Sequence, residues 1–338
     1  MQAPFDLKTC TRAALFSAMA LATGAVPAAD QPGEGVEVQL IKSSIAEETF
    51  QTLLVMKALE ELGHDVKDIK EIEYAAGHVA LGNGDATFMA DHWNPLHTDF
   101  YEAAGGDEKL YREGVYASGS IQGYLIDKKT AEAYEISNIG QFEAPQIAKL
   151  FDADRDGKAD LAGCTPGWGC EKLIEHHLDA YGLRDTVTHN QGSYSAIIAD
   201  TIARYEQGEP SFYYIWTPYW VSGVLVPGED AVWLQVPFSS LPGERADVDT
   251  ALPDGSNYGF QANDQRIVAN RAWAEAKPAA AELFKIMEVS NNDISAQNLR
   301  MRDGDDSEAD IEKHADAWIA ANREKFDAWL EQARAAAK

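Results

Sequence analysis

The stretch from Gly163 to Cys170 (GCTPGWGC) combines residue types that can bind a ligand or a metal. Trp168 stands there between two of the chain's three cysteines. Proline lacks an amide donor and glycine favours unusual backbone angles, so the stretch is predicted to form a constrained turn rather than a helix or a central strand. Such a turn presents Trp168 either as part of a binding surface or as a core side chain beside a structural disulfide.

Cys164 and Cys170 allow two interpretations. Export into an oxidising compartment, indicated by the N-terminus, favours a disulfide between them. The alternative is a zinc site, because His176 and His177 follow six and seven residues after Cys170. A zinc site requires both thiols to stay reduced in that compartment.

Residues 1–28 have the pattern of a secretory signal peptide. Lys8 and Arg12 form a basic start, residues 13–26 form an apolar run too short to span a bilayer, and the small residues that follow fit a cleavage site. Cys10 precedes the apolar run, the wrong order for a lipoprotein cysteine. The mature protein is therefore predicted to be exported and soluble.

Two further tryptophans follow predicted buried strands. The strand predicted over 87–90 leads into Trp93 and His97, and the strand predicted over 211–215 leads into Trp216. Ligands bind outside the carboxyl ends of strands in open α/β sheets, so these side chains stand where a site is expected. Both stretches read as turn, buried strand, tryptophan and proline. This repeated pattern predicts that each of two lobes presents one tryptophan to a shared cleft.

The elements that must position these residues alternate between strand and helix patterns, which predicts an α/β fold with two lobes. Ser43 and Ser44 are predicted to cap a helix that ends at Gly63. The predicted strands cover 36–41, 66–74, 87–90, 119–127, 186–189, 211–215 and 231–236. The further predicted helices cover 79–81, 145–151, 171–181, 194–205, 272–287, 294–302 and 308–338, with a loop over 242–259.

The charge and the motifs exclude several functions. A formal net charge of −27 argues against nucleic acid or an anionic membrane as a partner. The sequence has no serine nucleophile elbow, no zinc-protease helix motif and no phosphate loop followed by lysine. A cysteine held in a disulfide has no thiolate to pair with His97 as a base. The sequence therefore predicts a binding protein without a cofactor rather than an enzyme.

Tryptophans on strand ends and on a constrained turn fit a quaternary ammonium, which has no N–H to donate and binds best to aromatic faces. The carboxylate of a zwitterionic ligand needs donors, for which the candidates are the His97 side chain and the backbone N–H groups of Gly169 and Cys170. Trp318 and Trp329, by contrast, recur at helical spacing and are predicted to pack in the core.

Several stretches carry a resemblance to a known family: 47–55 (EETFQTLLV), 101–107 (YEAAGGD), 166–171 (PGWGCE), 188–192 (THNQG) and 216–221 (WTPYWV). From Ala29 to its C-terminus the chain resembles the ProX-type periplasmic glycine betaine and proline betaine binding proteins of ProU-type ABC transporters. The resemblance implies a type II, Venus-flytrap fold with the ligand cleft between two α/β lobes. It implies a first lobe made of 29–123 and 235–338, and a second lobe made of 124–234.

The resemblance also implies the site and the partners. The protein is expected to be a periplasmic monomer that captures glycine betaine or proline betaine and delivers it to a membrane permease for osmoprotectant uptake. The positions that match the family's trimethylammonium box are Trp93, Trp168 and Trp216. Those that match its carboxylate donors are His97, Gly169 and Cys170. Those that match its cysteine pair are Cys164 and Cys170. Asn94 and Thr165 depart from the family pattern near the site. The alternatives are a binding protein for choline, carnitine or an amino acid, and a sensor without transport.

An acidic stretch, 152–160 (DADRDGKAD), resembles a calcium loop. Oxygen ligands occupy positions 1, 3, 5 and 9, as Asp152, Asp154, Asp156 and Asp160, and glycine occupies position 6. Position 12 is Gly163, where the bidentate glutamate of an EF-hand is expected. The alternative is an acidic turn whose aspartates accept hydrogen bonds from the local backbone.

Overall fold

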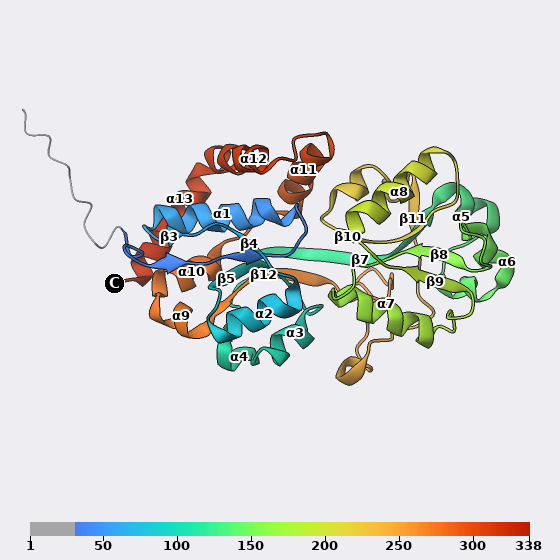
Figure 1. Ribbon diagram of the computed structural model, residues 1–338, viewed down its shortest axis with the longest axis horizontal. Helices are drawn as coiled ribbons and strands as arrows, with labels where there is room; N and C mark the ends of the chain where they lie inside the picture. The colour runs from blue at the N-terminus through green and yellow to red at the C-terminus, as the bar shows by residue number, and fades with distance from the viewer. Residues whose placement is uncertain (1–30) are drawn as a thin grey trace, which may run out of the picture.

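The computed structural model describes residues 31–338, so the predicted signal peptide, 1–28, lies outside the described part of the chain. Figure 1 shows two α/β lobes side by side, joined by long strands. This arrangement confirms the predicted two-lobed α/β fold. Among residues 31–338, no helix combines the length and the apolar character needed to cross a bilayer.

One mixed sheet continues through both lobes. Its order is β5-β12-β7-β10-β8-β9, with β11 also on β7 and β6 on β12. The strands are β5 Phe88–Asn94, β6 Leu110–Tyr111, β7 Ala117–Asp127, β8 Ala159–Ala162, β9 Val187–Asn190, β10 Phe212–Thr217, β11 Ala231–Trp233 and β12 Asn263–Asn270. The start of β7 pairs with β12 and the rest pairs with β10, so β7 crosses from one lobe into the other.

The first lobe contains both the N-terminal segment and the C-terminal helices, which lie together in Figure 1. α1 packs on α12, and α10 packs on α13. The helices of this lobe are α1 Glu48–Glu61, α2 Tyr74–Asn83, α3 Thr98–Ala103, α4 Gly106–Lys109, α9 Arg271–Ala276, α10 Pro278–Ile286, α11 Asn291–Arg302, α12 Glu308–Ala321 and α13 Arg323–Ala336. Its short strands are β1 Glu37–Val38, β2 Ile41–Lys42, β3 Asp65–Val66 and β4 Lys70–Glu71.

The second lobe surrounds β8, β9 and β10. Its α-helices and associated 3₁₀ helices are α5 Lys128–Tyr134, η1 Ile139–Glu143, α6 Pro145–Ala148, η2 Lys149–Phe151, α7 Gly169–Ala180, α8 Tyr194–Glu206 and η3 Trp220–Gly223. The segment after β11, which includes η4 Gly243–Arg245, also contacts this lobe. Gln235 forms a β-bridge with Asn138, and the Phe238 carbonyl accepts a hydrogen bond from the Tyr181 hydroxyl at 2.9 Å.

Some predicted helix boundaries are wrong. Ser43 and Ser44 do not cap α1, whose N-cap residue is Glu47. The Ser43 hydroxyl instead donates to the buried Glu48 carboxylate at 2.7 Å, so the need of that carboxylate for donors outweighs capping. The helix predicted over 272–287 is divided before Pro278, which has no amide to continue it.

Other elements differ from the sequence prediction as well. The final helix, predicted over 308–338, is divided at Asn322. The strand predicted over 66–74 is two short strands, and Tyr74 begins α2 instead. The sequence pattern does not predict β8 or β12. In β12 the side chain of Gln265 occupies one of the buried positions, which removes the alternation of apolar and polar residues that marks a strand.

The C-terminal tryptophans have the predicted packing role. Trp318 and Trp329 stack with ring centroids 6.2 Å apart; Trp329 belongs to the core of the first lobe, and the half-buried Trp318 packs against that core. The Ser307 side chain caps α12 by accepting a hydrogen bond from the Asp310 amide at 3.2 Å.

Candidate ligand-binding site

A cavity lies where the two lobes meet, and its walls come from both. The shared strand β7, the ends of β5 and β10, and the start of α7 contribute to it. The lining residues are Ile45, Tyr74, Trp93, Leu96, His97, Gln122, Trp168, Gly169, Cys170, Tyr214 and Trp216. The structure therefore brings together all six residues predicted to bind the ligand.

The first lobe supplies Trp93 and His97. Trp93 lies within β5 rather than after it, because the strand extends to Asn94. A cis peptide bond joins Asn94 to Pro95, and the following turn brings His97 back toward the strand. The Trp93 amide donates to His97 Nδ1 at 3.2 Å. Since Nδ1 accepts, the neutral imidazole carries its proton on Nε2, which is then the available donor of the ring.

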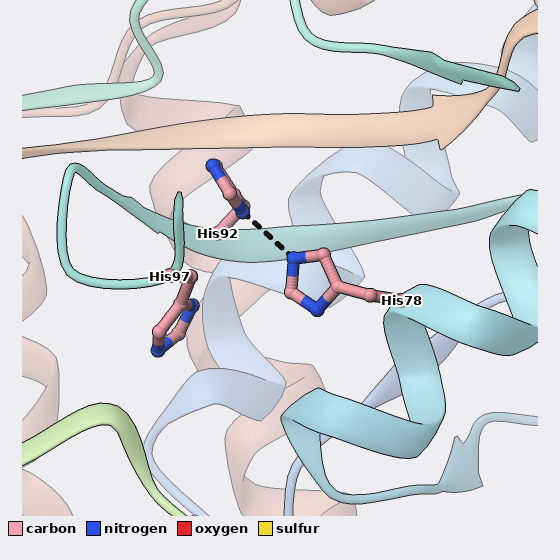
Figure 2. Close-up of side chains that lie close together, drawn as sticks. All are labelled: His78, His92 and His97. Carbon is pink, nitrogen blue, oxygen red and sulfur yellow. Dashed lines mark hydrogen bonds between the residues drawn. The ribbon is translucent and has the colours of Figure 1, made fainter. Parts of the chain in front are cut away.

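Two more buried histidines lie behind His97, as Figure 2 shows. His78 Nδ1 donates to the Tyr74 carbonyl at 2.6 Å, so His78 Nε2 accepts from His92 Nδ1 at 2.8 Å. Arg112 lies 3.4 Å from His92 Nε2. Burial lowers the pKa of His78 to about 4 and the pKa values of His92 and His97 well below their usual range. His78 and His92 therefore form a neutral, hydrogen-bonded pair, and each ring packs against His97 with centroids 5.8 Å apart.

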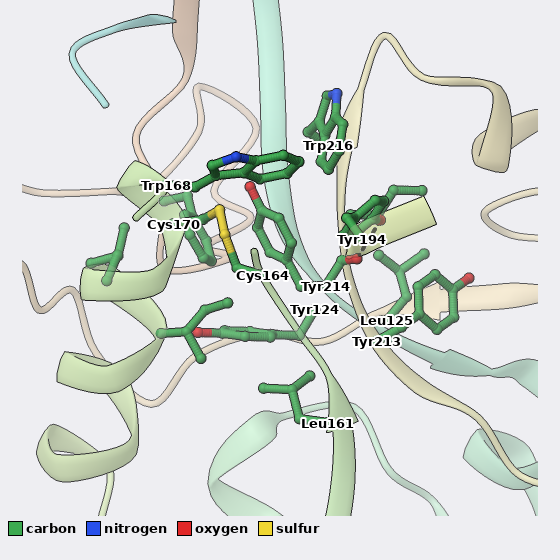
Figure 3. Close-up of a cluster of buried hydrophobic side chains, with 14 of the residues drawn as sticks. Tyr124, Leu125, Leu161, Cys164, Trp168, Cys170, Tyr194, Tyr213, Tyr214 and Trp216 are labelled. Carbon is green, nitrogen blue, oxygen red and sulfur yellow. Dashed lines mark hydrogen bonds between the residues drawn. A yellow bond between two sulfur atoms is a disulfide. The ribbon is translucent and has the colours of Figure 1, made fainter. Parts of the chain in front are cut away.

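The second lobe supplies Trp168 on the predicted turn. Cys164 and Cys170 form the predicted disulfide, with their Cα atoms 6.1 Å apart. Figure 3 shows this bond next to Trp168. The zinc alternative is wrong, because neither cysteine retains a thiolate. His177 instead lies 2.8 Å from the Tyr124 hydroxyl.

α7 begins immediately after this tryptophan, with Trp168 as its N-cap residue. The amides of Gly169 and Cys170 lie in the first turn, where no intrahelical acceptor exists, and the positive end of the helix dipole favours an anion there. A Cβ atom on Gly169 would lie 2.9 Å from Leu96 Cγ. Glycine therefore permits the close approach of the first-lobe loop to the start of α7.

The three cavity tryptophans are almost completely buried. The exposed fractions are 7% for Trp93, 5% for Trp168 and 6% for Trp216. Trp168 and Trp216 meet edge to face, with centroids 5.8 Å apart and planes at 76°. Tyr194 and Tyr219 pack on Trp216, with centroids 4.6 and 4.4 Å away. Together these rings form a desolvated aromatic wall, part of which is visible in Figure 3.

Tyr74, Tyr214 and Gln122 also line the cavity and were not predicted from the sequence, and Gln122 on β7 carries an amide. Its Oε1 accepts a hydrogen bond from the Tyr214 hydroxyl. Its buried Nε2 has no hydrogen-bond partner within residues 31–338, so it is an unused donor on the cavity wall. The available signal was a lone amide within an apolar strand, IQGYLI.

Two indole N–H groups of the second lobe donate to glutamates of the first. Trp168 Nε1 donates to Glu73 Oε2 at 3.1 Å, and Trp220 Nε1 donates to Glu47 Oε1 at 2.8 Å. Burial raises the pKa of Glu47. These bonds orient the indoles and join the lobes on two sides of the cavity.

The acidic stretch 152–160 forms a turn held by its own carboxylates. Asp152 accepts from the Gly157 amide at 3.0 Å, and Asp154 accepts from the Asp156 amide at 3.0 Å. Asp156 accepts from the Lys158 amide at 2.8 Å, and Asp160 accepts from the Ala153 amide at 2.6 Å. These bonds are the ones expected of the acidic-turn alternative. Carboxylate oxygens of Asp152, Asp154 and Asp156 also lie within 4.8 Å of one another. Calcium binding here stays a prediction, which calorimetry on chelator-treated protein tests.

The family model and two curated relatives that match this chain all concern glycine betaine binding. Residues 36–321 match the family model of the substrate binding domain of ABC-type glycine betaine transport systems. The chain is 58% identical over 332 residues to the glycine betaine-binding periplasmic protein OusX of Dickeya dadantii, covering 98% of this chain and 100% of the relative. It is 60% identical over 311 residues to the glycine betaine/proline betaine-binding periplasmic protein of Escherichia coli, covering 92% and 94%.

Solved structures support the same fold. The lactococcal OpuAC protein in its closed conformation with glycine betaine aligns with a TM-score of 0.66 and 19% identity, covering 87% of this chain and 99% of that one. At this identity the likeness concerns the fold alone. The family model and the curated relatives carry the assignment: the chain belongs to the family of substrate-binding domains of ABC-type glycine betaine transport systems.

Proposed function

We propose that this protein captures glycine betaine and proline betaine and delivers them to the membrane permease of a ProU-type ABC transporter for osmoprotectant uptake. The observation that carries the proposal is the combination, in one buried cavity, of three tryptophan rings with several unused hydrogen-bond donors. A quaternary ammonium needs the rings and a carboxylate needs the donors. The names of the two curated relatives support the same ligands.

The trimethylammonium group is proposed to contact Trp93, Trp168 and Trp216. Their burial supports this assignment, because cation–π attraction is strongest where water is excluded. The two indoles that meet edge to face, Trp168 and Trp216, offer two differently oriented faces.

The carboxylate is proposed to accept hydrogen bonds from His97 Nε2 and from the amides of Gly169 and Cys170. The Trp93 amide holds His97 in the donor tautomer, and the helix start leaves the two amides free. Gln122 Nε2 is a fourth donor that the cavity makes available.

The proposal extends to the cellular setting of the protein and to its lobes. The protein is proposed to work in the periplasm as a monomer, to bind no nucleic acid and to catalyse no reaction. The family resemblance implied a first lobe of 29–123 and 235–338 and a second lobe of 124–234. The contacts of Gln235 and Phe238 with the second lobe favour moving the stretch between β11 and β12 into that lobe.

Choline and amino acids are the main alternative ligands. Choline has no carboxylate and would leave the His97, Gly169 and Cys170 donors unpaired. An amino acid carries N–H groups, which water solvates better than an indole face does. Carnitine satisfies both ends of the site and differs in length.

Titration of intrinsic tryptophan fluorescence with glycine betaine, proline betaine, carnitine, choline and glycine tests the proposal. We expect the betaines to bind tightly, choline more weakly and glycine least. Equal affinities for glycine and glycine betaine would rule out a quaternary-ammonium site. Tighter binding of choline than of glycine betaine would assign the alternative function.

A further inference from the structure

A second, smaller cavity adjoins the ligand cavity. It shares Ile45, Trp93 and Trp216 with the ligand cavity. Two acidic side chains that line it, Glu48 and Asp91, are 5% and 0% exposed. A group in this cavity therefore lies next to Trp93 and Trp216, two of the rings proposed to contact the ammonium group.

The two acids differ in their partners. Glu48 accepts from the Ser43 amide at 3.2 Å, from the Ser43 hydroxyl at 2.7 Å and from the Tyr74 hydroxyl. Asp91 has one long contact, 3.5 Å from its Oδ2 to the Thr52 hydroxyl. Its Oδ1 has no hydrogen-bond partner within the described chain.

No cationic side chain lines this cavity within residues 31–338. The nearest basic residue that affects the pair is Lys42. Its charge lowers the pKa values of both acids, but its Nζ donates to the Ser43 carbonyl at 3.0 Å and to Glu71 at 2.9 Å rather than to either of them.

The other ionisable groups around the pair add no positive charge. Glu47 lines the same cavity and is itself an acid. Burial raises the pKa values of the neighbouring phenols Tyr74, Tyr116 and Tyr219, which stay neutral. His97, on the ligand side, has a lowered pKa and is neutral as well.

Two buried carboxyl groups that line one cavity cannot both be ionised at low cost, and burial outweighs the charge of Lys42, so the two groups together keep a proton. Burial raises the pKa of Glu48 to about 7 and the pKa of Asp91 well above its usual range. A cation held against Trp93 and Trp216 reverses this balance, because it favours the doubly ionised pair.

We propose that Glu48 and Asp91 form an acid pair that supplies counter-charge to the bound quaternary ammonium and releases a proton to solvent when the ligand binds. This inference rests on the proposed function, because it needs a cationic ligand. The proton passes to the buffer and no other bond changes. Affinity for betaine should consequently rise with pH around neutrality.

Calorimetric titration of glycine betaine into the mature protein tests the proposal, at pH 6, 7 and 8, in phosphate and in Tris. Their different ionisation enthalpies reveal how many protons leave on binding. We expect release of a fraction of a proton near pH 7 and an affinity several-fold higher at pH 8 than at pH 6. Proton uptake, or no exchange at any of these pH values, would overturn the proposal.

Asp91→Asn and Glu48→Gln each leave one carboxyl group in the pair. Each variant should lose the proton release and the pH dependence, and should bind betaine about threefold or more weakly at pH 8. Glu108→Gln, an exposed acid of the same lobe, should behave like the wild type. Proton release that persists in both pair variants would assign it to another group. A wild type that binds no betaine would refute the proposed function instead.

Discussion

β5 and β10 end in the same way and differ in the residues after the proline. Each strand carries a cavity tryptophan next to its carboxyl end, Trp93 or Trp216, and each is followed by a cis X-Pro bond. After the first proline the chain places His97 in the cavity wall. After the second it places Tyr219 against Trp216.

One backbone arrangement therefore supplies an aromatic face from each lobe. The residues after the proline decide whether the side chain next to that tryptophan is polar or aromatic. The first lobe adds a hydrogen-bond donor to its tryptophan, and the second adds a further aromatic ring. Trp168 shares neither arrangement, because a disulfide-bounded turn and a helix start present it. Substitutions at these positions can separate the contributions.

The largest expected effect is on the shared feature. Trp93→Ala and Trp216→Ala should each weaken glycine betaine about tenfold or more, and the double variant about a hundredfold, because each ring contributes on the order of 1 to 2 kcal/mol to a desolvated cation. Calorimetric titration measures this. Trp318→Ala, which removes core packing only, should lower the melting temperature and leave the affinity unchanged. A large loss of affinity in only one of the two single variants would show that the two strand ends do not contribute equally to binding.

The lobes also differ in buried histidines, which are concentrated in the first. The pKa of His78 is lowered to about 4, so the unfolded state binds the extra proton below about pH 6.5 and stability is lost as pH falls toward 4. This histidine alone should lower the free energy of unfolding by about 2 kcal/mol at pH 5. Burial raises the pKa of Glu48 to about 7, which opposes the trend by favouring the fold as pH falls.

Denaturant unfolding at pH 7 and pH 5 measures how much stability the protein loses over this interval, with the opposing effects of the histidines and of Glu48 combined. The His78→Gln variant should lose less stability than the wild type over this interval, whatever the acids contribute to both. An identical loss in the two proteins would show that His78 does not titrate differently in the folded and unfolded states.

His97 is the element that distinguishes the first strand end from the second. His97→Ala should weaken glycine betaine about tenfold, because a hydrogen bond to a charged carboxylate is lost. The same variant should bind choline almost as well as the wild type does, since choline carries no carboxylate. Tyr219→Phe, the matched change after the second proline, should leave the ratio of the two affinities unaltered. Equal losses for both ligands in His97→Ala would assign His97 a structural role.

The smallest expected effect concerns the bonds that join the lobes. Glu73→Ala should weaken betaine about threefold, because Trp168 loses the acceptor that orients its ring. In a Trp168→Phe background, which has no indole N–H, the same change should add almost nothing. Additive losses in this double-mutant cycle, measured by calorimetry, would show that Glu73 acts through some other contact.

Local sequence signals predicted much of the site. Proline, glycine and cysteine spacing located the turn that carries Trp168, and buried strands followed by tryptophan and proline located Trp93 and Trp216. These signals depend on residues close along the chain, whose backbone preferences act before any tertiary contact forms. The family resemblance then implied the roles of His97 and the helix-start amides.

Tertiary structure alone decided the rest. The bond between Glu73 and Trp168 spans 95 residues, and that between Glu47 and Trp220 spans 173. β12 escaped prediction because its burial depends on the strands on either side of it and not on its own alternation. The burial of Glu48 and Asp91 beside one cavity and the free amide of Gln122 likewise arise only when distant elements pack. No local periodicity encodes such contacts, because they depend on which surfaces the whole chain buries together.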